Sequence, residues 1–155
     1  MFIRASIFVL SLAGLADSLY FTLAYYGRIR QARWVPEILC AREGSSCLTV
    51  VQTPYAHVFG VPNSLLGIVY YLLLIAGAMG NWSVGAYPYV HFTYFVISWV
   101  QLLIFLSAGT TILGFYLIYA LRRRLHVDCP LCYTAHAINA ALFVLLCIVA
   151  FRPAF

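Results

Sequence analysis

Four long apolar stretches alternate with polar or turn-forming segments along the 155 residues of the chain. The apolar stretches cover residues 3–26, 62–80, 89–121 and 129–151. Each provides the roughly 20 apolar residues that a helix needs to cross the hydrocarbon core of a bilayer. The pattern therefore predicts an all-α membrane protein, in which four transmembrane helices form a bundle.

The third stretch, residues 89–121, is longer than one crossing of the bilayer requires. Two crossings would need a turn near Ser107-Ala108-Gly109, and no turn signal is visible there. We therefore expect one long tilted helix that starts with aromatic residues at the membrane interface. Small residues such as Gly14 and Ser18, or Gly109 and Gly114, should let neighbouring helices approach closely.

A polar loop over residues 27–61 joins the first two spans and holds four arginines, two glutamates and two cysteines, Cys40 and Cys47. Within it, Ser46 precedes the apolar residues 47–52, which favours a short helix that stops near Pro54. Because the chain crosses the membrane at each span, this loop lies on the same side as the loop at residues 122–128. Each of the two loops therefore brings a cysteine pair to that side.

The composition supports the membrane assignment, since 65% of the residues are hydrophobic, 8% are charged and the mean hydropathy is +0.95. A soluble domain is about half apolar and a quarter charged. We expect one membrane domain over residues 1–155, without a fused thioredoxin-like domain and with the first span retained as a helix. The nine basic residues are all arginines that cluster in loops, which argues against nucleic acid as a partner.

The run Cys129-Pro130-Leu131-Cys132 opens the fourth span. At a helix start, free backbone N–H groups and the helix dipole favour the reactive thiolate form of a cysteine. The arginines at 122–124 add positive charge, so this pair should cycle between dithiol and disulfide. Beside it, Cys40 and Cys47 complete a relay in which a thiolate attacks a disulfide and a second thiol resolves the mixed disulfide.

Three other interpretations of the cysteines remain open at this point. Two structural disulfides would hold together a scaffold protein on an outer surface. A zinc site built from the four thiols with His57 or His126 is less expected, since only one short Cys-x-x-Cys turn is present. A small transporter with a metal-binding mouth is the third, and we assign no metal ligands. Cys147 lies within a span and reads as a small buried hydrophobe.

A polar stripe continues from the Cys-x-x-Cys pair along the fourth span. The stripe consists of Cys129, Cys132, His136, Asn139 and Phe143, whose spacings of three and four put them on one helix face. Such groups face either a bound flat redox molecule or a neighbouring helix, and the cysteines favour the redox molecule. Nucleotide, haem and iron–sulfur motifs are absent from the sequence, which leaves a lipid-soluble quinone as the natural electron acceptor.

These residues together resemble vitamin K epoxide reductase and its stand-alone archaeal and bacterial homologues. The resemblance is carried by Cys40 and Cys47, by residues 54–67, and by Cys129-Pro130-Leu131-Cys132 with Ala137-Ile138-Asn139. It implies a four-helix bundle around a quinone of the menaquinone or ubiquinone type, capped by the loop and its short helix. It further implies an enzyme that oxidises a thioredoxin-like thiol protein and so forms disulfide bonds.

The resemblance also assigns roles to single residues. Cys132 corresponds to the cysteine next to the quinone, Cys129 exchanges with Cys47, and Cys40 meets the thiol of the partner. Asn63 matches an asparagine that donates a hydrogen bond to a quinone carbonyl, and the quinone site also includes Ser64, His136 and Asn139. Animal members have a tyrosine at the position of His136, so reduction of an epoxide does not follow from the resemblance.

The arginines are distributed unequally between the two sides of the membrane. Seven lie on the cysteine side (28, 30, 33, 42 and 122–124), and two, Arg4 and Arg152, lie on the other. The positive-inside rule then favours a cytoplasmic position of the cysteine loops in this multi-pass cell-membrane protein, which is an inverted topology. In the alternative, the arginines lower thiol pKa values or attract partners, and the topology is conventional. Asp17, the only acid inside a predicted span, is either a proton donor for quinone chemistry or a hydrogen-bonding partner of a neighbouring helix.

Overall fold

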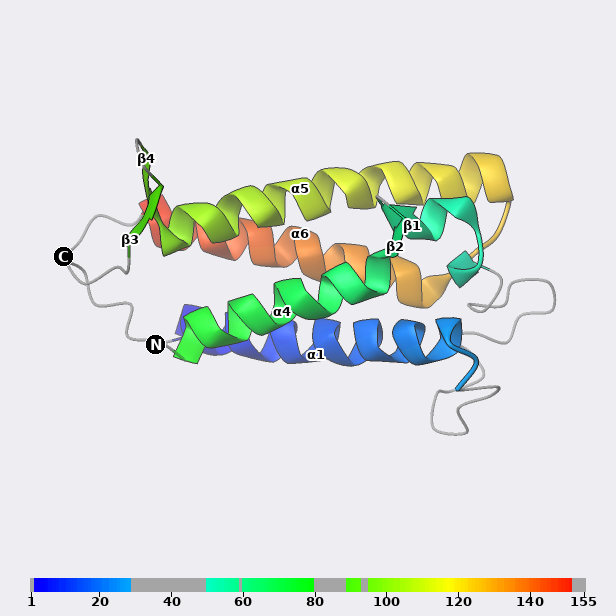
Figure 1. Cartoon of the computed structure of the whole chain (residues 1–155), viewed down its shortest axis with the longest axis horizontal. Helices are drawn as coiled ribbons and strands as arrows, with labels where there is room; N and C mark the ends of the chain where they lie inside the picture. The colour runs from blue at the N-terminus through cyan, green and yellow to red at the C-terminus, as the bar shows by residue number, and fades with distance from the viewer. Residues whose placement is uncertain (1, 29–49, 59, 80–88, 93–94, 152–155) are drawn as a thin grey trace.

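The computed structural model describes residues 2–28, 50–58, 60–79, 89–92 and 95–151. Its described part contains four α-helices, α1 (Phe2–Tyr25), α4 (Asn63–Met79), α5 (Trp99–Ala120) and α6 (Pro130–Phe151). They run side by side along the length of the molecule (Figure 1). Three of them are long and apolar enough to cross a membrane, and α4 is a shorter apolar helix. The predicted all-α membrane bundle is confirmed.

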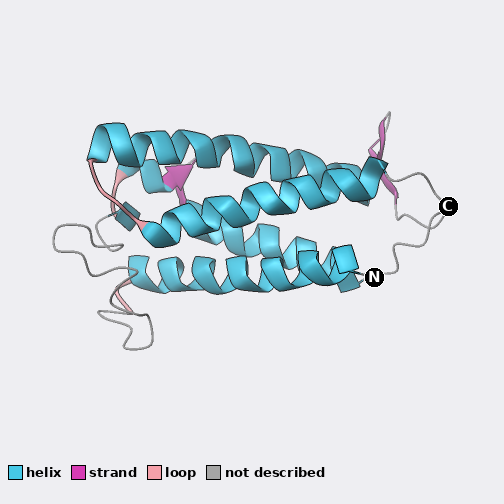
Figure 2. Cartoon of the chain, turned by 180° about the vertical axis from the view of Figure 1, so that it is seen from behind, coloured by secondary structure: helices cyan, strands magenta, loops and turns pink. Residues whose placement is uncertain are grey.

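One end of the bundle is where α1 and α5 end and α4 and α6 begin (Figure 1). We call it the functional end, because Cys129 and Cys132 lie there at the start of α6. A short antiparallel hairpin, β1 (His57–Val58) with β2 (Val61–Pro62), lies at this end. The opposite end carries a second hairpin, β3 (Tyr89–Phe92) with β4 (Phe95–Ser98). Seen from behind, the helices make up the length of the molecule and the strands lie toward its ends (Figure 2).

The prediction of one helix over residues 89–121 is wrong at its beginning. Residues 89–92 and 95–98 pair as antiparallel strands, and α5 begins at Trp99. The stretch before Trp99 is rich in aromatic and β-branched residues, which favour strands. The helical segment over residues 99–125 still has 27 residues and is long and apolar enough to cross the bilayer. The last turn, η2 (Leu121–Leu125), is a π-helix that ends at His126 with a left-handed φ of 52°.

The short helix expected over residues 46–52 is described only at its end. Val50 and Val51 are helical, and residues 46–49 lie outside the described residues. The Thr53 hydroxyl donates a hydrogen bond to the Val50 carbonyl oxygen over 2.7 Å, and a 3₁₀ turn, η1 (Pro54–Ala56), follows. The helix therefore stops just before Pro54, as the sequence indicates.

Small residues determine how closely the helices pack. A Cβ atom added to Gly14 on α1 would overlap the Tyr71 ring of α4, and one added to Gly67 would lie 2.6 Å from the Ser18 hydroxyl. Side-chain-free positions on both helices thus let α1 and α4 pack closely, as expected for Gly14 and Ser18. Gly109 differs from that expectation, because a Cβ there would meet nothing within 4 Å.

The helices pack around the bundle in the order α4, α1, α6, α5. The pairs α1–α4, α5–α6 and α1–α6 contact each other extensively, whereas α4 and α5 meet much less. The main buried core joins all four helices and contains Ile7, Tyr71, Leu74, Leu103 and Leu142. The weak contact between α4 and α5 leaves one side of the bundle less tightly closed.

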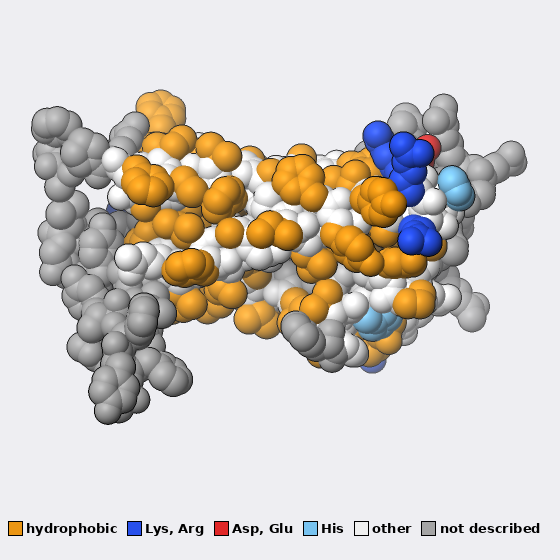
Figure 3. Space-filling view, turned by 90° about the horizontal axis from the view of Figure 1, so that it is seen from above, with side chains coloured by type: hydrophobic (Ala, Val, Ile, Leu, Met, Phe, Trp, Pro, Cys, Tyr) orange, Lys and Arg blue, Asp and Glu red, His pale blue; other side chains and the backbone are white. Residues whose placement is uncertain are grey.

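Large apolar side chains remain exposed on the outside of the bundle, including Val69, Phe105 and Ile112. The face in Figure 3 carries apolar side chains along its length, with arginine side chains gathered near one end. The exposed arginines at 122–124 belong to the functional end. An apolar belt bounded by charge is the surface that a bilayer requires.

Candidate functional site

Cys129 and Cys132 form a disulfide at the start of α6, with 5.3 Å between their Cα atoms. Pro130 occupies the first helical position, where its missing N–H is not needed. Both cysteines are buried, and the backbone N–H of Cys132 lies 3.3 Å from the Cys129 sulfur. In the reduced pair, an N–H aimed at this sulfur favours its thiolate. The structure thus contains the bond between the two sulfurs that the sequence led us to expect.

A cavity of about 600 Å³ extends from the functional end into the bundle, and its size is typical of small-molecule sites. Residues of all four helices and of the segment 50–56 line it, and most of them are apolar. The polar side chains on its walls include Asp17, Asn63, Ser64, Cys132, His136 and Asn139.

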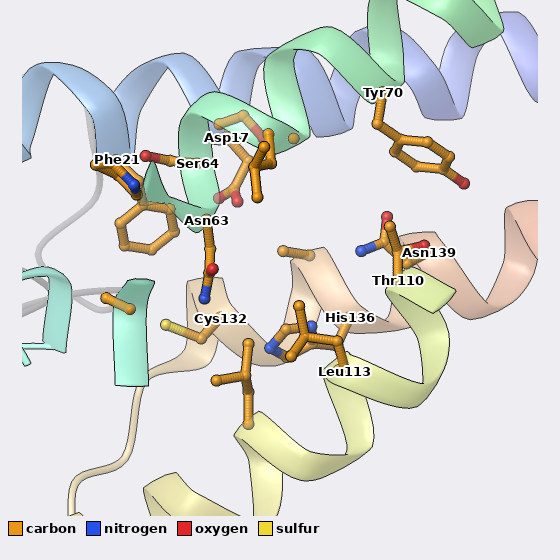
Figure 4. Close-up of a pocket in the computed structure, with 18 of the residues that line it drawn as sticks. Asp17, Phe21, Asn63, Ser64, Tyr70, Thr110, Leu113, Cys132, His136 and Asn139 are labelled. Atoms are coloured by element: carbon orange, nitrogen blue, oxygen red, sulfur yellow. The ribbon is translucent and has the colours of Figure 1, made fainter. Parts of the chain in front are cut away.

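The structure brings together five of the residues expected at the site: Asn63, Ser64, Cys132, His136 and Asn139 all line the cavity. Figure 4 shows Asn63 and Ser64 coming from α4, and Cys132, His136 and Asn139 coming from α6.

The remaining members of the predicted site lie elsewhere. Cys129 is packed behind the cavity wall in a cluster with Phe21 and Leu121. Phe143, the last residue of the predicted stripe, does not line the cavity. Cys40 and Cys47 lie outside the described residues.

Several buried polar atoms on the cavity wall have no hydrogen-bond partner within the described part of the chain. They are the Asn63 side-chain oxygen, the Ser64 hydroxyl and Nδ1 of His136. The Asn63 amide nitrogen donates to the Tyr55 carbonyl oxygen over 3.1 Å, which uses one of its two hydrogens. Buried polar atoms are nearly always satisfied in native proteins, so these atoms are available to hydrogen-bond water or a polar ligand in the cavity.

Neighbouring residues place the two polar side chains of α6. A Cβ added to Gly114 on α5 would lie 2.9 Å from His136 Nδ1, so the glycine makes room for the imidazole ring. The Asn139 oxygen accepts a hydrogen bond from the Tyr71 hydroxyl over 2.7 Å. Asn139 therefore bonds a neighbouring helix, as one of the two alternatives drawn from the sequence expected, and it also lines the cavity.

Tyr71 and Gly114 are site residues that the sequence analysis missed. Asn63, Gly67 and Tyr71 recur every four residues along α4, a spacing that places them on one helix face. The signal for Tyr71 in the sequence is therefore this spacing, which resembles that of the polar stripe on α6. Gly114 was expected only to allow close helix packing, and its contact with His136 adds a role in the site.

Three other residues discussed in the sequence, His57, Asp128 and Cys147, are not among the residues that line the cavity. Nδ1 of His57 lies 3.2 Å from the Thr53 carbonyl oxygen, and the His57 ring packs edge-on against the Tyr25 ring. Asp128 accepts a hydrogen bond from the Tyr133 hydroxyl over 3.3 Å. Cys147 is a free, half-buried thiol, so it is less buried than expected.

An apolar helical bundle with a cysteine pair at the edge of an internal cavity defines a membrane protein of the thiol redox class. The family model of the Vitamin K epoxide reductase family matches residues 5–147. The chain therefore belongs to this family, and the resemblance seen in the sequence is confirmed. Because the family is one of oxidoreductases, the protein is a membrane redox enzyme. A comparison with curated proteins finds no match.

Proposed function

We propose that the protein is a quinone-linked thiol oxidoreductase that forms disulfide bonds in a thioredoxin-like partner. One observation carries this proposal: Cys132, a member of the Cys-x-x-Cys pair, lines a large apolar cavity inside the bundle. A thiol in that position reaches water-soluble proteins only through a second pair, and it faces the interior of the membrane directly.

The electron path begins at the loop cysteines. Two thiols of the partner reduce a Cys40–Cys47 disulfide and become a disulfide themselves. The Cys47 thiolate then attacks the Cys129 sulfur, and Cys132 leaves as a thiolate that faces the cavity. Cys40 resolves the Cys47–Cys129 mixed disulfide. Each exchange transfers two electrons, so the relay delivers a reduced Cys129 and Cys132 pair to the cavity.

The cavity residues fit a quinone head group. A quinone accepts two electrons and two protons from the reduced pair. The Ser64 hydroxyl and the second amide hydrogen of Asn63 can donate to a carbonyl oxygen, and the free Asn63 oxygen can accept from a hydroxyl. His136 can donate or accept according to its tautomer. The apolar walls suit the ring and the start of its tail.

A lipid-soluble substrate also needs a route into the cavity. Four apolar wall residues of α4 and α5 are exposed on the outside, with exposed fractions of 43% for Leu66, 58% for Val69, 71% for Phe105 and 38% for Leu106. They belong to α4 and α5, which pack less closely than the other neighbouring helices of the bundle. We propose that quinone enters from the bilayer between α4 and α5.

The arginines support a cytoplasmic position of the functional end. Exposed Arg28 and the arginines at 122–124 lie at this end. Arg4 lies at the other, where its guanidinium donates to the Ala78 carbonyl oxygen over 2.9 Å. Positive charge favours the cytoplasmic side of the membrane. A membrane-impermeant thiol reagent should then label Cys40 or Cys47 in inverted vesicles but not in intact cells.

Anaerobic turnover tests the proposed activity. The purified protein is mixed with a reduced thioredoxin-like protein and a quinone, and quinone reduction is followed for wild type, Cys132→Ser and Cys147→Ser. Turnover in wild type and Cys147→Ser that disappears in Cys132→Ser supports the proposal. Absence of turnover with several quinones, despite folded protein and an intact disulfide, would leave a membrane protein with structural disulfides.

A further inference from the structure

Asp17 has an unusual position for an acidic residue. The chain has four acids, and of these Asp17 alone lies inside a described helix, two turns before the end of α1. Its half-buried side chain lines the cavity. An ionisable side chain inside a membrane is costly, and in proteins it usually marks a functional path.

The Asp17 carboxyl group makes no hydrogen bond or ion pair with any described residue. Its electrostatic neighbours there are the phenols of Tyr20 and Tyr71. The structural alternative, in which Asp17 bonds a neighbouring helix, therefore lacks a partner in the described part of the chain. The close contact of Ser18 with Gly67 holds this part of α1 against α4.

The titratable groups on the other walls of the cavity are few. They are the phenols of Tyr55, Tyr70 and Tyr71, the imidazole of His136 and the Cys132 thiol. Tyr70 and Tyr71 are hydrogen-bonded to Ser107 and Asn139, and phenols lose protons only near pH 10. Asp17 lies on the α1 side of the cavity, and Cys132 and His136 lie on the α6 side (Figure 4).

We propose that Asp17 is a proton carrier of the cavity and delivers a proton to the bound electron acceptor on the α1 side. The inference rests on the proposed function. The exchange leaves Cys132 as a thiolate and Cys129 as a thiol, and Asp17 holds a proton that the partner thiols released. As the Cys129–Cys132 bond forms again, the pair gives the acceptor two electrons and the Cys129 proton, and Asp17 gives its proton to an acceptor oxygen. The next exchange protonates Asp17 again. The carboxyl group is thus unchanged over the cycle.

Asp17→Asn tests this role, because the amide has almost the same shape and cannot carry the proton. Quinone reduction by the pre-reduced variant should slow by about 100-fold or more, the scale of general acid catalysis, with little change in KM. Asp17→Glu keeps a carboxyl group and should stay within about tenfold of wild type. Ser11→Ala is the matched control, since Ser11 is a fully buried polar residue of α1 that does not line the cavity.

Two measurements that need no quinone accompany the rates. The infrared difference spectrum between the dithiol and disulfide forms should contain the C=O band of a protonated carboxyl group in wild type and Asp17→Glu, and not in Asp17→Asn. Exchange of the Cys129–Cys132 pair with partner thiols should be equal in all variants, which shows that Asp17→Asn is folded.

The outcomes separate the two proposals. Wild type that reduces no quinone refutes the proposed function. If wild type and Asp17→Asn reduce quinone at equal rates, or if the carboxyl band remains in Asp17→Asn, the role of Asp17 is refuted and the proposed function stands. Loss of thiol exchange in both Asp17 variants would show that Asp17 is structural, which also overturns the inference.

Discussion

The Tyr71 hydroxyl on α4 donates a hydrogen bond to the side-chain oxygen of Asn139 on α6, with 2.7 Å between the two oxygens. Because the hydroxyl donates to the amide oxygen, the amide nitrogen of Asn139 remains available as a donor. The tyrosine ring fits against α1 because Gly14 has no side chain. One contact thus links three helices and orients a polar group on the cavity wall.

Tyr71→Phe should weaken quinone binding. Without the hydroxyl, the Asn139 amide is free to rotate, and loss of one fixed hydrogen bond should raise KM by about 3- to 10-fold. Ser107→Ala is the matched control, since it removes the bond between Ser107 and Tyr70 and Ser107 does not line the cavity. Thermal unfolding in detergent should show similar losses of stability for the two variants. Steady-state kinetics should show a raised KM in Tyr71→Phe only. Equal KM values in both variants would contradict the orienting role.

Gly14→Ala should destabilise the bundle. The added methyl group would overlap the Tyr71 ring and push α1 from α4, which should cost about 1–3 kcal/mol of unfolding free energy. Gly109→Ala is the matched control, because its methyl group meets open space. The unfolding temperatures of the two variants in one detergent give the comparison. A Gly14→Ala protein as stable as Gly109→Ala would mean that α1 and α4 pack less closely than described.

A bulky residue at position 109 should obstruct the proposed entry between α4 and α5. Gly109 is exposed on α5 and lines the cavity, whereas Ile112 is 70% exposed on the same helix and does not line it. Gly109→Trp should raise KM for a long-tailed quinone more than for a tail-free analogue, and Ile112→Trp should change neither. Entry elsewhere is indicated if Gly109→Trp affects both quinones equally or not at all.

The helices and the α6 wall of the cavity were accessible from the sequence, because their signals are local. A membrane helix is marked by its length and apolarity, and the spacing of Cys132, His136 and Asn139 already places them on one face. Asn63 and Ser64 were found through the family motif and not through periodicity. The structure shows that both groups line one cavity.

The remaining features depend on which helices meet, and one sequence does not encode that in a local pattern. The Tyr71–Asn139 bond joins residues 68 positions apart on α4 and α6. It also requires the Tyr71 ring to pack against α1 at Gly14. The start of α5 at Trp99 was missed for a different reason. Apolar aromatic and β-branched residues suit a membrane helix and a strand about equally well in a hydropathy pattern, so residues 89–98 carried no clear boundary.

A single-turnover reaction of the membrane pair tests the transfer from Cys132 to quinone most directly. The loop pair is removed by Cys40→Ser and Cys47→Ser, the remaining pair is reduced under anaerobic conditions, and one equivalent of quinone is added. We expect one quinol for each Cys129–Cys132 disulfide formed, measured by absorbance and by mass spectrometry, and no quinol after the further change Cys132→Ser. Quinone that stays oxidised beside a reduced, folded Cys129 and Cys132 pair would contradict the account.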